Sequence, residues 1–151
     1  MATPLAAALE HVVSVLEATE PAGGRPTLRY RLAEYLAIPD PENETGNALE
    51  DRSFAFGDPV GDEYEGTAGI SLRLRPYLVP VVLYLATAEL GSLIRTALIG
   101  EHSATWARAL DAVSTWPQGV LEVVTLPSEP RVTDTGDTLL VTTLRVVVWE
   151  T

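Results

Sequence analysis

The apolar residues near the N-terminus repeat with the period of an α-helix. Their spacing of three, four or seven residues places them on one side of a helix, and they are Leu5, Leu9, Val12, Val13 and Leu16. Thr3 before Pro4 has the form of an N-cap followed by a proline in the first turn. Pro21 and the glycines that follow it end the pattern. We therefore predict a helix that begins at Pro4 and ends before Pro21.

The pattern then changes to alternation of apolar and polar residues, which predicts β-strands. Residues 26–37 alternate in this way, with Leu28, Tyr30 and Leu32 on one side, before two prolines end the run. Phe54 and Phe56 alternate with small residues and indicate a second, short strand.

A third strand is predicted where residues 70–75 alternate again. Pro76 and Pro80 follow, and because proline cannot donate a backbone hydrogen bond we expect a bend or an edge position there. Residues 81–85 are apolar on both sides and predict a buried strand.

Helical spacing returns in the second half of the chain. We predict a helix over residues 88–99 that stops at Gly100, with His102 in the turn after it. Trp106 and Leu110 lie four residues apart and predict a further short helix.

Two strands are predicted to close the chain, over residues 120–126 and 138–150, with a polar connection between them. The last strand is apolar on both sides. One side carries Leu140, Thr142, Leu144, Val146 and Val148, and the other carries Val141, Thr143, Arg145, Val147 and Trp149. Both sides need cover, and we expect the helices of the chain to cover one and a neighbouring subunit to cover the other.

The order of these elements predicts a single α+β domain over residues 1–151. Consecutive strands joined by turns favour a mainly antiparallel sheet, here of four or five strands, with both helices packed on one face. The length of 151 residues fits one domain, and no apolar run is long enough to span a bilayer.

The charge of the chain limits its partners. The formal net charge is −11, all ten basic residues are arginine, and there is no cysteine. Such a negative protein repels phosphate backbones and anionic membranes, so neither sequence-specific nucleic-acid binding nor membrane docking is expected. Without cysteine, disulfide and thiolate chemistry are excluded.

Most of the negative charge lies in one loop or insertion at about residues 39–69. Residues 39–66 hold nine acidic side chains and one arginine, a net charge of −8. The stretch is either a solvated surface loop or an acidic surface that faces a partner or passing DNA. The residues that we assign to this acidic surface are Asp40, Glu42, Glu44, Asp58, Asp62, Glu63 and Glu65.

The sequence contains no convergent catalytic set. Nucleotide-binding loops, nucleophile elbows and paired metal-binding histidines are missing, and His11 and His102 stand alone. Asp58 and its acidic neighbours resemble a loose calcium cluster, but the order of ligands in a helix–loop–helix calcium site is missing. We therefore expect no catalytic residue, no metal and no cofactor.

Five arginines lie on predicted strands, where they either face solvent beside local acids or form a belt that pairs with the acidic loop of a neighbouring subunit. Arginine suits the second role because its guanidinium binds a carboxylate through two hydrogen bonds. The residues that we assign to a subunit interface are Arg29, Arg31, Arg73, Arg75, Arg145, Val147 and Trp149.

This layout resembles the tail terminator (tail completion) proteins of bacteriophages. The matching features are the leading amphipathic helix, the strand around residues 28–36, the long insertion at 39–69, the passage from strand to helix over 70–99 and the closing strand pair over 120–150. The stretch from Trp106 to Pro117 is longer than the resemblance leads us to expect.

The resemblance implies a structural virion protein and not an enzyme. Members of the family form hexameric rings at the head-proximal end of the tail, where they end polymerisation of the tail tube and join the tail to the neck. It implies copies of itself, the tail tube protein and the head–tail connector as partners, a channel through which genome DNA passes, and assembly in the host cytoplasm. Two other functions stay open: another ring protein of the head–tail joint, or a small ligand-binding α+β module. An enclosed cavity lined by a few polar groups would favour the ligand-binding module.

Overall fold

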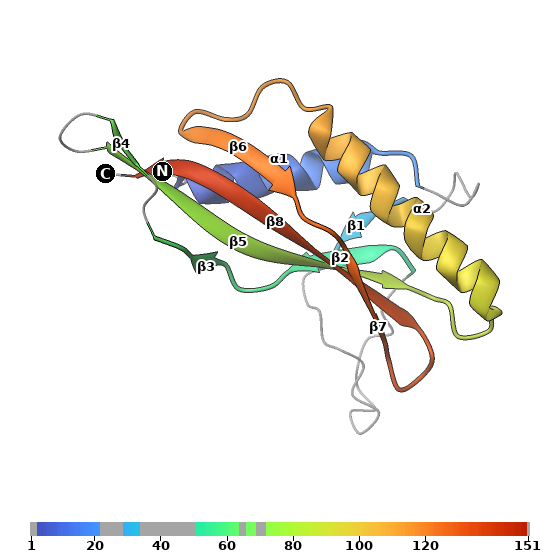
Figure 1. The fold of residues 1–151 in the computed structure, drawn as a ribbon. Coiled ribbons are helices and arrows are strands. Elements are labelled where there is room, and N and C mark those ends of the chain that lie inside the picture. Colours follow the sequence, from blue (N-terminus) through green and yellow to red (C-terminus); the bar gives the residue numbers. More distant parts are fainter. Residues whose placement is uncertain (1–2, 22–28, 34–50, 64–65, 69–71, 151) are drawn as a thin grey trace.

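The computed structural model describes residues 3–21, 29–33, 51–63, 66–68 and 72–150. Within these ranges the chain forms two helices and one sheet of eight strand segments (Figure 1). The elements in chain order are α1 (Pro4–Ala18), β1 (Arg31–Leu32), β2 (Ser53–Phe56), β3 (Val60–Gly61), β4 (Gly66–Ala68), β5 (Leu72–Leu85), α2 (Ser92–Asp111), β6 (Val120–Thr125), β7 (Glu129–Val132) and β8 (Thr138–Glu150). The predicted α+β class is confirmed. The sheet has more segments than expected because short strands pair along β5 and β8.

Helix α1 forms as its sequence predicts. The hydroxyl oxygen of Thr3 accepts a hydrogen bond from the Ala6 amide at 3.2 Å, and Pro4 occupies the first turn. Ala8, Val12 and Leu16 are fully buried against the sheet. The apolar stripe therefore seats α1 on the core.

The longest pairing in the sheet is the antiparallel ladder between β5 and β8, whose two strands run side by side through the molecule in Figure 1. It extends without a register shift from Leu85 opposite Thr138 to Arg73 opposite Glu150. The predicted last strand is thus confirmed over its whole length. The shorter strands flank this ladder, with β2, β3 and β4 pairing to β5, and β6 and β7 pairing to β8.

The expected bend or edge position at Pro76 and Pro80 is wrong, because β5 continues through both prolines as one strand and lies between β2 and β8 in the sheet. Their carbonyl oxygens accept hydrogen bonds from Asp62 and Gly57, on the side of β5 where β2 and β3 lie. In a strand the amide position and the carbonyl of one residue point the same way, so both proline nitrogens face that side. The ladder to β8 therefore loses no hydrogen bond.

Helix α2 corrects two predictions. It does not stop at Gly100 but runs on to Asp111, so the two helices expected on either side of this glycine are one. His102 consequently lies inside the helix, and its side chain is buried together with those of Trp106 and Leu110. A glycine inside a helix costs only about 1 kcal/mol, which burial of these large side chains outweighs.

Both helices pack on the same face of the sheet. The core between them and the sheet holds Val79, Val81 and Leu83 of β5, with alternate residues of β8 such as Leu144 and Val146. The side chains of Tyr30 and Phe54 each meet Trp106 edge to face, with ring centroids 5.5 Å apart. These rings join β2 and the segment before β1 to α2.

Two connections differ from the sequence-based expectation. The polar stretch before the last strand contains β7, which pairs with the start of β8 as a hairpin. Of the strand expected over residues 26–37, residues 29–33 are described, and they form the two-residue β1 parallel to β2. The sheet is therefore mixed, although its long pairings are antiparallel.

Two glycine substitutions are expected to change stability in opposite directions. Gly119 has a φ of +90°, and a Cβ there would lie 2.9 Å from the Pro4 side chain, so Gly119→Ala should destabilise the protein by about 1–2 kcal/mol. Gly100 lies exposed within α2 with open space around it, so Gly100→Ala should stabilise the protein by roughly 1 kcal/mol. Urea unfolding followed by circular dichroism measures both changes. A destabilising Gly100→Ala would contradict a continuous α2.

Candidate functional site

One face of the β5–β8 ladder carries no described helix or strand across it. Side chains alternate along a strand, so every second residue of β5 and β8 points into the helix-covered core and the residues between them point to the opposite face. We call it the open face, and its residues are Leu72, Leu74, Pro76, Leu78, Pro80, Val82, Tyr84, Leu139, Val141, Thr143, Arg145, Val147 and Trp149. Most are apolar, as expected from the two-sided pattern of the last strand.

The open face is continuous with apolar side chains on neighbouring strands. Val124 of β6 pairs with Arg145 and is 38% exposed, and Val60 of β3 pairs with Leu78 and is 63% exposed. Val147, near the middle of the face, is 1% exposed, and its partner Pro76 on β5 is buried as well. The face is thus packed at its centre and leaves apolar groups accessible around it.

The five arginines assigned to an interface do not lie on one face. Arg145 lies on the open face, where its guanidinium binds Glu122 at 3.2 Å. Arg73 and Arg75 point to the opposite face, and Arg75 contacts Glu150 at 3.6 Å and stacks 5.1 Å from the centre of the Tyr77 ring. Arg29 and Arg31 are exposed at and just before β1. The structure therefore brings Arg145, Val147 and Trp149 together and separates them from Arg73 and Arg75.

The acidic surface is described only in part. Asp58, Asp62 and Glu63 are exposed around β3. The other assigned residues lie outside the described ranges, and they are Asp40, Glu42, Glu44 and Glu65. Within the described ranges no three acidic or histidine side chains are grouped so that they could hold a metal ion.

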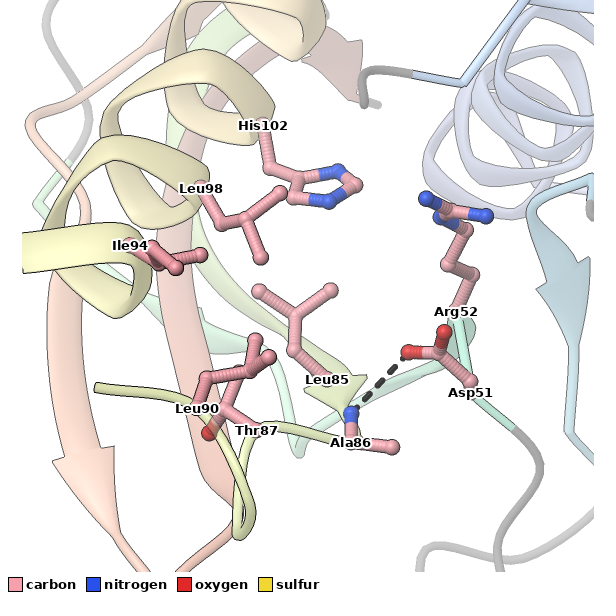
Figure 2. Close-up of a pocket in the computed structure, with 9 residues that line it drawn as sticks. All are labelled: Asp51, Arg52, Leu85, Ala86, Thr87, Leu90, Ile94, Leu98 and His102. Carbon is pink, nitrogen blue, oxygen red and sulfur yellow. Dashed lines mark hydrogen bonds between the residues drawn. The ribbon is translucent and has the colours of Figure 1, made fainter. Parts of the chain in front are cut away.

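A cavity that the sequence analysis missed lies at the other end of β5. It measures about 240 Å³ and lies between residues 51–52, the end of β5 with its following loop, and the first turns of α2. Figure 2 shows Asp51 and Arg52 on one side and Leu90, Ile94 and Leu98 on the other, with the His102 ring at one end. These residues are distant in the sequence, and no local motif links them.

The polar end of the cavity centres on His102, whose side chain is 1% exposed. Its Nδ1 atom lies 2.6 Å from the Tyr30 hydroxyl. Burial lowers the pKa of His102 from 6.5 to about 4, the positive charge of Arg52 adds to this effect, and the negative charge of Asp51 opposes it. His102 is therefore neutral at pH 7.

The backbone beside the cavity is strained at Arg52. Its φ of +69° is unusual for a residue other than glycine. Hydrogen bonds on both sides hold it there, since its amide donates to the Tyr84 carbonyl at 2.8 Å and its carbonyl accepts from the Arg31 amide at 3.1 Å. Such strain persists only where surrounding contacts enforce it, and it is often found at functional sites.

Asp137 holds the loop that forms one wall of the cavity. Its carboxylate accepts hydrogen bonds from the amides of Thr87 and Ala88, each at 3.1 Å, and from the Tyr84 hydroxyl. Burial would raise the pKa of Asp137, but these hydrogen bonds, with one from Thr135, outweigh burial and hold the pKa below its usual value. Burial, together with the hydrogen bond to Asp137, raises the pKa of Tyr84 above its usual range.

Comparisons with known proteins assign no family. The sequence matches no protein-family model, and no curated protein matches it. Neither described helix combines the length and apolar character of a membrane span.

The buried His102 should make stability depend on pH. Because its pKa falls from 6.5 to about 4 on folding, the unfolded chain binds a proton in this range that the folded chain does not. Stability should therefore fall as the pH drops from 6.5 to 4, by up to roughly 3 kcal/mol for this group. Chemical unfolding at a series of pH values measures the effect. His102→Asn, which keeps a polar partner for Tyr30, should flatten this slope, and parallel slopes in both proteins would contradict the assignment.

Proposed function

We propose that this protein is a ring-forming assembly protein of a bacteriophage tail. It ends polymerisation of the tail tube at the head-proximal end and joins the tail to the neck. The proposal follows from the resemblance of the element order to tail terminator proteins. The observation that supports it is the open face, an apolar sheet surface with no described element across it.

An apolar sheet face of this kind favours association with another protein chain. Val60, Leu72 and Val124 are exposed apolar side chains on this face, and a partner chain that covered them would remove their apolar surface from water. Arg145 and Glu122 add a charged pair on the same face and provide polar specificity at an interface. In a ring each copy presents this face to a different surface of the next copy. Repeating this contact rotates each copy relative to the one before, and the last copy meets the first.

The charge of the molecule fits a channel through which DNA passes. The net charge of −11 and the exposed Asp58, Asp62 and Glu63 offer DNA no cluster of phosphate-binding groups. An acidic lumen wall therefore lets the genome move without being held. Other rings of the head–tail joint share these requirements, so the same face also supports a head-completion protein.

Substitution on the open face should prevent assembly without unfolding the chain. Val124→Lys places a charge on an exposed strand residue of this face. If this face is buried against a neighbouring copy, the ammonium group loses its water, and that loss costs free energy. We expect the unmodified protein to form closed rings in multi-angle light scattering and negative-stain electron microscopy, and the variant to remain a monomer.

Ala104→Lys is the matched control, because it adds the same charge on the exposed side of α2. This variant should assemble like the unmodified protein, and circular dichroism should show both variants folded. An unmodified protein that stays monomeric at its highest soluble concentration would contradict the proposal.

A further inference from the structure

We propose that the first two turns of α2 in one copy of the protein pack across the open face of the next copy. A head-to-tail contact joins two different surfaces, and the open face supplies one of them. The inference rests on the proposed ring, because it names the second surface. We call this surface the α2 ridge, and its residues are Leu93, Ile94, Arg95 and Ala97.

The α2 ridge exposes apolar side chains in a stretch that is almost free of charge. Leu93 is 85% exposed, more than any other large apolar side chain among the described residues, and Ile94 is 57% exposed. Ala97 lies four residues after Leu93, so it is exposed beside it on the helix surface. Within residues 90–100 the one charged side chain is Arg95. A partner that covered the ridge would remove this apolar surface from water.

The open face offers a row of side chains that a helix can cover. The row takes one residue from each of β3, β5, β8 and β6, paired in register, and its members are Val60, Leu78, Arg145 and Val124. Neighbouring strands lie about 4.8 Å apart, so the row is about 14 Å wide. An α-helix with its side chains is roughly 10–12 Å across, so one helix covers most of the row. The two valines at its ends are the apolar groups that remain exposed.

The β3 end of this row is acidic. Asp62 follows Val60 by two residues and therefore points to the same side, and its amide continues the pairing by donating to the Pro76 carbonyl at 2.9 Å. Asp58 and Glu63 are exposed beside it. No salt bridge to another described residue neutralises these three carboxylates.

The α2 ridge carries the opposite charge. Arg95 donates to the Thr87 carbonyl at 3.4 Å and makes no salt bridge with a described carboxylate. The first turn of α2 holds no acidic residue, so the positive end of the helix dipole adds to the charge of Arg95. In a protein of net charge −11, this positive ridge and the acidic end of the row are complementary.

The two surfaces lie too far apart to meet within one chain, which makes a second copy the partner. β3 pairs with Tyr77 and Leu78 of β5, whereas α2 begins beyond the other end of this strand (Figure 1). From Leu78 to Leu85 the strand advances about 23 Å, at about 3.3 Å per residue. A contact between two separate surfaces also repeats from copy to copy, as a ring requires, and does not stop at a symmetric dimer.

Leu93→Glu tests the ridge without disturbing the core, because this side chain is 85% exposed. The variant loses apolar area and gains a carboxylate near the acidic end of the row. We expect it to stay monomeric in multi-angle light scattering under conditions in which the unmodified protein forms rings. Ala104→Glu is the matched control, since it adds the same charge on the exposed side of α2 and should still assemble. Circular dichroism should show both variants folded.

A mixture of two variants that do not assemble identifies the two halves of the contact. Leu93→Glu has an altered ridge and an intact open face, and Val124→Glu has the reverse. In a 1:1 mixture one intact contact can form between unlike chains, while the other would bring two carboxylates together. We therefore expect a heterodimer in sedimentation velocity and no ring.

Charge reversal tests the electrostatic part of the contact. Arg95→Glu should raise the protein concentration needed for ring formation by about tenfold. Asp62→Arg in the same chain should restore assembly, because the pair is then reversed across every contact. Arg108→Glu, the same change in the last turn of α2, should leave assembly unchanged.

Two results would overturn this inference while leaving the proposed ring intact. They are rings formed by Leu93→Glu and a 1:1 mixture that remains monomeric although the unmodified protein forms rings. An unmodified protein that stays monomeric overturns the proposed ring itself, and the inference with it.

Discussion

The ladder between β5 and β8 is the constraint on which the rest of the structure depends. Its hydrogen bonds fix which residues of two long strands oppose each other, and alternation then decides which side chains point toward the helices and which point away. A shift by one residue would place Leu144 and Val146 on the open face and Arg145 in the core. The register between β5 and β8 therefore determines both which residues form the helix-covered core and which form the open face.

Sequence reasoning succeeded where the signal is local. The N-cap Thr3 with Pro4 defined the start of α1, and uninterrupted alternation defined β8 over residues 138–150. It failed where distant contacts outweigh a local preference. Gly100 suggested a helix end, but burial of His102 and Trp106 carries α2 past it.

The candidate sites also differ in whether a local sequence pattern could predict them. The open face could be anticipated because one strand showed apolar residues on both sides. The division of the arginines between two faces could not, because it depends on the register of β5 against β8. The cavity gave no signal in the sequence, since residues 51–52, the end of β5 and three turns of α2 meet only in the folded chain. Arg52 in particular has no local pattern that predicts its positive φ.

The placement of Pro76 and Pro80 limits how the sheet can grow. Both lack an amide hydrogen on the same flank of β5, and the short β2 and β3 lie along that flank. A foreign strand that displaced β2 and β3 would find carbonyl acceptors but no amide donors at these two positions, so its pairing would be incomplete. Strand exchange along this flank of β5 is thereby disfavoured, although the flank faces two short strands of the sheet.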